Sequence, residues 1–158
     1  MTHPRTTSQI ASARMDGVTV LVCVGDSFTE GMSDDLRPDG HHVGWSDRAA
    51  HGLAILAARD GATVSYANLA VRGKLLDQVV AEQLPLVERF TPGITTFHAG
   101  PNDVLRRGTD LADLYRRYDA AVARTAAASD RVLLFTSIGR AGGTGRVAQA
   151  LADRFGAF

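Results

Sequence analysis

The chain has 158 residues, of which 45% are hydrophobic and 22% charged, and its formal net charge at pH 7 is zero. This length suits a single globular domain with a substantial core. The neutral charge balance gives no basic surface for nucleic acid or an anionic membrane, so we expect neither as a partner. The single cysteine, Cys23, excludes an internal disulfide and is expected in the core.

The first 16 residues are polar and lack the apolar stretch of a signal peptide. We therefore expect a flexible N-terminal arm over residues 1–16, followed by one domain over residues 17–158. No segment approaches the roughly 20 apolar residues of a transmembrane helix. Together these features predict a cytoplasmic protein.

Four apolar runs rich in β-branched and aromatic residues follow the arm. The first run, VTVLVCV, ends at Gly25, and the others begin at Thr63, Ile94 and Arg131. Short and nearly continuous apolar runs are typical of parallel strands that are covered on both faces. The sequence therefore predicts four parallel strands.

Between these runs the apolar residues recur at helical spacing. The predicted helical faces cover residues 45–56, 76–87, 111–122 and 147–155. Pro85 lies inside the second helix and is expected to kink it. Thr109 or Asp110 is expected to cap the third helix. Alternating strands and helices predict an α/β protein, a three-layer α/β/α sandwich around a parallel sheet with right-handed crossovers.

In such a sheet the ligand site lies at the carboxyl ends of the strands. Three of these ends carry glycine and hydrogen-bonding groups: GDSFTEG after the first strand, NLAVRGK after the second and HAGPND after the third. The three segments are therefore expected to meet at one edge of the sheet.

These segments contain the parts that acyl transfer to serine requires, namely a nucleophile and donors for the developing oxyanion. Ser27 supplies a hydroxyl and its own N–H, Gly73 an accessible N–H, and Asn102 a side-chain amide. Each donor in such an oxyanion hole is typically worth ~3–4 kcal/mol of barrier. Singly, each residue suits an ordinary turn or helix cap; together, at three successive strand ends, they indicate nucleophilic catalysis.

The three segments resemble the signature blocks of the SGNH, or GDSL, hydrolases. GW-DR after the first block and LLFT in the fourth strand add to the resemblance, which extends from about Val18 to the last residue. The resemblance implies a flavodoxin-like sandwich, with Ser27 as nucleophile and Ser27 N–H, Gly73 N–H and Asn102 as the oxyanion hole. It also implies an ester or thioester substrate and no cofactor. We expect a small substrate with a short acyl chain, because no segment of the sequence resembles a lid or a large apolar funnel. No cluster of histidine, cysteine and carboxylate residues has metal-ligand spacing, so we expect no metal.

The sequence departs from the family pattern after the third block. The family places an Asp-x-x-His block near its C-terminus, whereas no such block follows Asn102 here and no histidine follows His98. We therefore expect a C-terminally truncated domain with a fifth strand missing and an exposed sheet edge through which the chain could self-associate. The base stays unassigned. His98 could approach the site or turn into the core, whereas His41, His42 and His51 suit solvated or structural positions.

Two alternatives to a serine esterase stay open. Without a base, the chain would be a catalytically impaired binding or remnant protein of the same fold, retaining only about 10³–10⁴-fold acceleration over water. The second alternative is a dinucleotide-binding protein. Gly143-x-Gly145-x-x-Ala148 follows the fourth strand and opens a helix, as the dinucleotide-binding fingerprint does. That fingerprint normally follows the first strand, with an acidic residue about 20 positions later.

Overall fold

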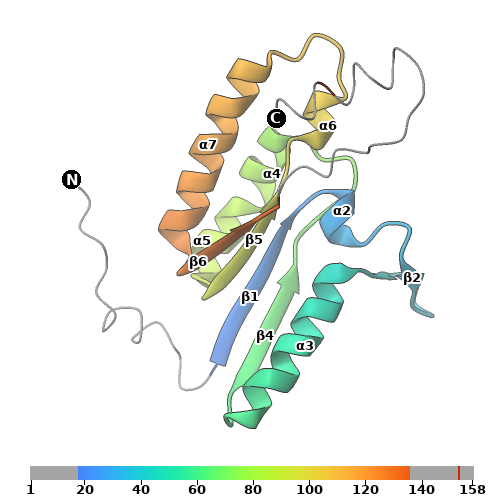
Figure 1. Cartoon of the computed structure of the whole chain (residues 1–158), viewed down its shortest axis with the longest axis vertical. Helices are drawn as coiled ribbons and strands as arrows, with labels where there is room; N and C mark the ends of the chain where they lie inside the picture. Colours follow the sequence, from blue (N-terminus) through green and yellow to red (C-terminus); the bar gives the residue numbers. More distant parts are fainter. Residues whose placement is uncertain (1–17, 136–152, 154–158) are drawn as a thin grey trace.

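The structure, a computed structural model, describes residues 18–135 and residue 153. Its main sheet has four parallel strands in the order β4-β1-β5-β6 (Figure 1), namely β1 Val18–Gly25, β4 Thr63–Asn68, β5 Ile94–His98 and β6 Arg131–Leu134. Each strand begins or ends at the residue that the sequence predicts, and the α/β sandwich is confirmed. The predictions for residues 1–16, for the apolar residues Val147, Leu151 and Phe155 and for the glycines at 143 and 145 lie outside the described residues.

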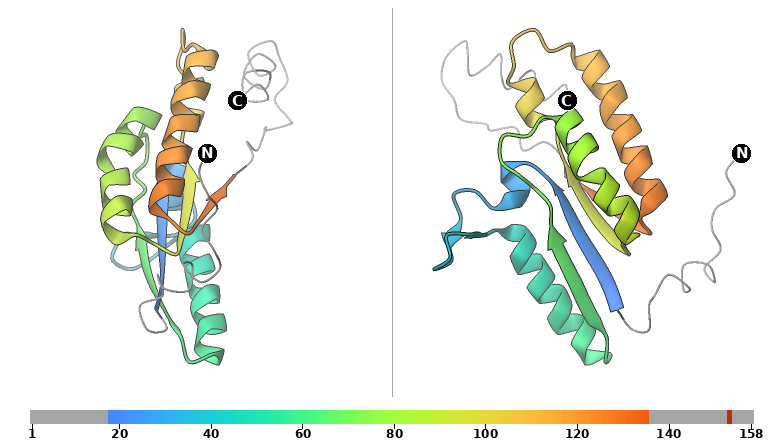
Figure 2. Two further views of the ribbon diagram at one scale, coloured as in Figure 1. Left: turned by 90° about the vertical axis from the view of Figure 1, so that its left-hand side faces the viewer. Right: turned by 180° about the vertical axis from the view of Figure 1, so that it is seen from behind.

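Helices cover both faces of the sheet (Figure 2). One face carries α3, Trp45–Arg59, and the other carries α4 Leu76–Glu82, α5 Leu84–Phe90 and α7 Leu111–Ala128. Successive side chains of β1 point to opposite faces of the sheet, and this explains the two cores. Val22 and Val24 pack in the core beneath α4, α5 and α7, whereas Leu21 and Cys23 pack on the side of α3. Cys23 is buried as predicted, and burial raises the pKa of its thiol.

Three short elements are additions to the predicted fold. Helices α2, Ser27–Glu30, and α6, Pro101–Val104, follow β1 and β5 directly. A small antiparallel ribbon, β2 Asp35–Leu36 with β3 His42–Val43, precedes α3. Each is too short to show a hydrophobic period, which is why the sequence pattern does not reveal it. Of the two predicted caps of α7, Thr109 and Asp110, the structure shows Asp110. Its side chain accepts a hydrogen bond from Ala112 N–H at 2.9 Å.

The single kinked helix predicted over residues 76–87 is two helices, so this prediction is wrong in detail. Pro85 lies in the first turn of α5, where its missing N–H leaves no bond unmade. Gln83 lies between the two helices and is only 3% exposed. Its side chain accepts from Gly25 N–H at 2.8 Å and donates to Gly25 O at 2.9 Å. The helix break therefore places an amide against the end of β1.

Gly25 is also fixed from the opposite side, by β5. In the strand register it is paired with His98. A Cβ on Gly25 would lie 2.3 Å from the His98 carbonyl oxygen, and its φ of +151° lies in a region that residues with a side chain rarely adopt. Only glycine fits this position. The last residue of β1 is therefore held between a buried amide and the neighbouring strand.

Replacing Gln83 with leucine keeps the side chain similar in size but makes it apolar and removes both bonds to Gly25. We expect the free energy of unfolding to fall by about 1–3 kcal/mol, because the Gly25 N–H is left buried and unpaired while the Gly25 carbonyl keeps its bond from Val71 N–H. Urea denaturation followed by circular dichroism measures the change. Arg89→Ala, on the exposed surface of α5, is the control and should shift stability by less than about 0.5 kcal/mol. Equal midpoints for Gln83→Leu and the wild type would contradict this role of Gln83.

Candidate active site

The three residues expected at the site follow three adjacent parallel strands. Ser27 is the first residue of α2, directly beyond β1. Gly73 lies in the turn between β4 and α4, and Asn102 lies in α6, beyond β5. Because β4, β1 and β5 are neighbours in the sheet, their carboxyl ends lie at one edge (Figure 1). Ser27 and Asn102 are half-buried, whereas Gly73 is exposed.

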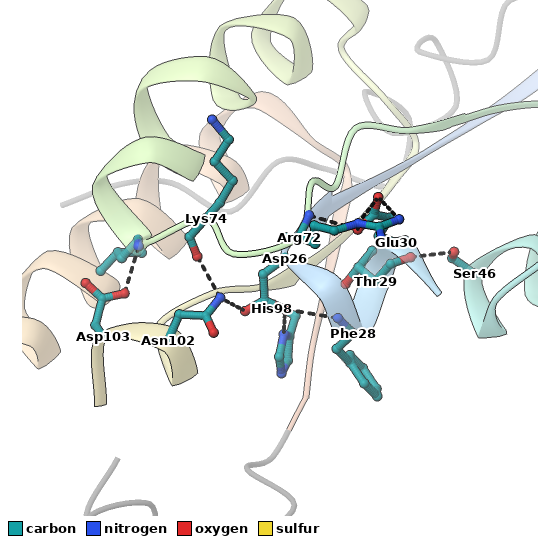
Figure 3. A network of polar contacts seen from close by, with 12 residues as sticks. Asp26, Phe28, Thr29, Glu30, Ser46, Arg72, Lys74, His98, Asn102 and Asp103 are labelled. Carbon is teal, nitrogen blue, oxygen red and sulfur yellow. Dashed lines mark hydrogen bonds and ion pairs between the residues drawn. The ribbon is translucent and has the colours of Figure 1, made fainter. Parts of the chain in front are cut away.

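A buried carboxylate, that of Asp26, connects these elements (Figure 3). Asp26 is 2% exposed and is the N-cap of α2. Its Oδ1 accepts from Phe28 N–H at 3.1 Å and lies 3.2 Å from His98 Nδ1, and its Oδ2 accepts from Asn102 Nδ2 at 3.3 Å. The sequence alone predicted no role for Asp26 at the site. Its place between a strand end and a helix start is the pattern of a helix cap, and that signal could have identified it.

Asn102 joins the loops that carry the other two expected residues. Its Nδ2 donates to the Lys74 carbonyl oxygen at 2.9 Å and, over a longer distance of 3.3 Å, to Asp26 Oδ2. Lys74 follows Gly73 in the chain, and Asp26 precedes Ser27. One side-chain amide therefore bonds to the direct neighbours of both expected residues, and the structure brings the three loops together.

The turn that contains Gly73 is tied to α2 by an ion pair. Arg72 N–H donates to Glu30 Oε2 at 2.8 Å, and the Arg72 guanidinium also bonds to the Glu30 carboxylate at 3.0 Å (Figure 3). Gly73 itself has a φ of +75°, the left-handed conformation that glycine adopts most readily. Within the described part of the chain, its N–H makes no hydrogen bond. The turn is therefore fixed while one of its backbone donors stays accessible.

The carbonyl groups of α2 are bonded by side chains from α3 and β4. Because α2 has only four residues, its last carbonyl oxygens have no intrahelical partners. Trp45 Nε1 donates to Phe28 O at 2.9 Å, and Asn68 Nδ2 and Ser46 Oγ each donate to Thr29 O at 2.9 Å. Trp45 and Asn68 belong to the GW-DR and NLA segments of the sequence. Their side chains hold the turn that presents Ser27.

His98 lies neither in the core nor in free solvent. Its side chain is 18% exposed, and its ring centroid lies 4.6 Å from that of Phe28 and 6.0 Å from that of Phe135. Trp45 and Phe135 also line an apolar pocket of about 500 Å³ between α3 and β6. The imidazole is therefore packed among aromatic rings on the α3 side of the sheet, with Nδ1 directed to Asp26.

The described residues, 18–135 and 153, form neither a cluster suited to a metal ion nor a helix suited to a membrane. Among these residues, no group of three or more histidine, cysteine or carboxylate side chains is arranged to hold a metal ion. No helix in the same part of the chain is long and apolar enough to cross a membrane.

Comparisons with known proteins agree with this geometry. The model of the GDSL-like lipase/acylhydrolase family matches residues 23–158. Among solved structures, TesA is 23% identical over 88% of this chain and 72% of its own, with a TM-score of 0.57. A catalytic mutant of Axe2, an acetylxylan esterase from Geobacillus stearothermophilus, is 19% identical over 87% of this chain and 68% of its own, with a TM-score of 0.66.

A third solved structure is LAE5, an alpha/beta hydrolase enzyme from the metagenome of Lake Arreo, Spain. It is 21% identical over 87% of this chain and 69% of its own, with a TM-score of 0.63. At these identities the structural likeness concerns the fold. No curated protein sequence matches the chain.

The ion pair between Arg72 and Glu30 is expected to hold the Gly73 turn. In Glu30→Ala the Arg72 amide loses its acceptor, so its hydrogen exchange should accelerate by at least about tenfold. The free energy of unfolding should change by less than about 1 kcal/mol, because the Arg72 side chain is largely exposed. Amide hydrogen exchange followed by NMR measures the exchange rate of the Arg72 amide and, from the slowest amides, the free energy of unfolding. Glu82→Ala, which removes the ion pair of Lys74 in the same turn, is the control. Unchanged protection of the Arg72 amide in Glu30→Ala would show that this tie is not what orders the turn.

Proposed function

The chain belongs to the GDSL-like lipase/acylhydrolase family, and we propose that it hydrolyses small esters through an acyl-enzyme formed on Ser27. Ester hydrolysis is the chemistry of this family. The nucleophile, the oxyanion donors and the substrate size are our proposal for this chain.

The observation that carries the proposal is the bridging position of Asn102. Its amide bonds to the carbonyl of Lys74 and the carboxylate of Asp26, the neighbours of Gly73 and Ser27. A substrate carbonyl attacked by Ser27 Oγ would therefore lie close to all three loops. Such convergence of a hydroxyl with several donors is what nucleophilic acyl transfer needs.

Three donors would stabilise the oxyanion that develops on the substrate. Ser27 N–H and Gly73 N–H make no hydrogen bond to another described residue, so both can donate. The third donor is Asn102 Nδ2, whose longer bond, to Asp26 Oδ2, is the one that an oxyanion would replace. Donors that are fixed before the reaction lower its barrier, typically by about 3 kcal/mol each, because they need little reorganisation.

Short acyl groups such as acetyl are the substrates that we propose first. The structural neighbour Axe2 is an acetylxylan esterase, which makes acetyl esters a reasonable starting point. The alcohol part of the substrate is set by loops whose sequence carries no general code. Relative kcat/KM values for p-nitrophenyl acetate and p-nitrophenyl octanoate measure the preference for acyl length.

Ser27→Ala tests the proposed nucleophile. We expect the wild-type chain to hydrolyse p-nitrophenyl acetate and to be labelled at Ser27 by a fluorophosphonate, because both reactions require an activated hydroxyl. In Ser27→Ala the label should disappear and hydrolysis should fall by at least about 100-fold. Ser65→Ala, at an exposed serine of β4, is the matched control and should behave as the wild type. Labelling that persists in Ser27→Ala would overturn the proposal.

A further inference from the structure

We propose that His98, oriented by Asp26, is the base that accepts the proton of Ser27. This inference rests on the proposed function, in which Ser27 is the nucleophile. It concerns the group that the sequence leaves unassigned, and it follows from contacts that only the folded chain shows.

The pair formed by His98 and Asp26 has the geometry of an oriented base. His98 Nδ1 lies 3.2 Å from Asp26 Oδ1, and the Asp26 side chain is only 3% exposed. In the tautomer that we propose, Nδ1 donates to Asp26 Oδ1 and Nε2 keeps its lone pair. No described residue hydrogen-bonds to Nε2. This tautomer is the one that a general base of a serine hydrolase uses.

The same carboxylate also fixes the turn of the nucleophile. Asp26 precedes Ser27 in the chain and caps α2 by accepting from Phe28 N–H at 3.1 Å. The strand register pairs His98 with Gly25, two residues before Ser27. The imidazole is therefore held beside the short segment that leads to Ser27. A nucleophile, a base and a third group that orients the base are the components of a catalytic triad.

The surroundings hold the imidazole ring in place. Phe28 packs against it, with ring centroids 4.6 Å apart, and Phe135 meets it edge-on. The side chain is 18% exposed, so part of the ring is accessible to a small substrate. Aromatic packing restricts the ring to one orientation, which lowers the entropy cost of proton transfer.

The other histidines of the described chain lack these features. His41 and His51 are exposed, and His51 lies on α3. His42 Nδ1 lies 3.4 Å from the backbone oxygen of Asp34. Among the four histidines that the structure describes, His98 alone is hydrogen-bonded to a carboxylate side chain.

The proposed reaction has two steps. Ser27 Oγ bonds to the acyl carbon while its proton passes to His98 Nε2, and the resulting imidazolium is stabilised by Asp26. The bond from the acyl carbon to the alcohol oxygen then breaks, and Nε2 returns the proton to the leaving alcohol. In the second step a water molecule gives its proton to Nε2 and attacks the acyl carbon. Ser27 Oγ leaves and regains a proton from Nε2, which releases the free acid.

A purely structural role for His98 makes a different prediction, and His98→Asn separates the two. The asparagine amide can donate to Asp26 in the place of Nδ1, yet it cannot accept a proton at pH 7. If His98 only holds Asp26, His98→Asn keeps its activity. If His98 is the base, His98→Asn fails together with His98→Ala.

The test measures the rate of Ser27 acylation by p-nitrophenyl acetate in the full chain, with folding of each variant checked by thermal unfolding. We expect His98→Asn and His98→Ala both to acylate about 10²–10⁴ times more slowly than the wild type. Added imidazole should restore part of the rate of His98→Ala. His51→Asn is the matched control and should acylate at the wild-type rate.

Three outcomes would overturn the assignment. The first is that His98→Asn is acylated at the same rate as the wild-type chain. The second is that added imidazole does not raise the acylation rate of His98→Ala. The third is that the wild-type chain is acylated no faster than His98→Ala. If Ser27 is not the nucleophile, the result is different. Ser27→Ala would then release p-nitrophenol from p-nitrophenyl acetate as fast as the wild type, whatever residue stands at position 98.

Discussion

The site depends on burying the carboxylate of Asp26. Removing a charge from water is unfavourable unless hydrogen bonds replace the lost hydration. Here the donors come from three separate elements: the backbone of α2 at Phe28, the end of β5 at His98 and α6 at Asn102. The folded state must bring all three to the same point. The requirement that stabilises this charge therefore also assembles the edge of the sheet at which Ser27 lies.

A second constraint fixes the backbone on which this carboxylate stands. Gly25 is paired with the buried amide of Gln83 on one side and lies too close to β5 on the other for any side chain. The turn beyond it is held by Trp45 and Asn68 through the carbonyl oxygens of α2. Groups that are fixed on rigid elements need little reorganisation when charge develops, and this is the main source of catalysis by an oxyanion hole.

Most of the fold follows from local sequence patterns. The four strands begin or end where apolar, β-branched runs do, because parallel strands are covered on both faces and need such residues. The break at Gln83 was not predictable in this way. Pro85 is compatible with either a kink or a new first turn, and the choice depends on the contact between Gln83 and Gly25, which are 58 residues apart in the chain.

The site was predictable in part. The glycine-rich segments at three strand ends indicate where groups converge, since the carboxyl ends of neighbouring parallel strands share an edge. The contact between Asp26 and His98 was not evident, because it joins residues that are 72 positions apart in the chain. Alternation does explain the side on which His98 lies. Phe97 packs in the core beneath α7, so the next residue faces α3.

The chemistry proposed for this site requires the transfer of an acyl group to Ser27. The most direct measurement is mass spectrometry of the full chain quenched during reaction with p-nitrophenyl acetate, followed by peptide mapping. We expect a single acetyl group on the peptide that contains Ser27. An acetyl group found only on another residue, such as Lys74, or an unmodified chain throughout the reaction, would contradict the account.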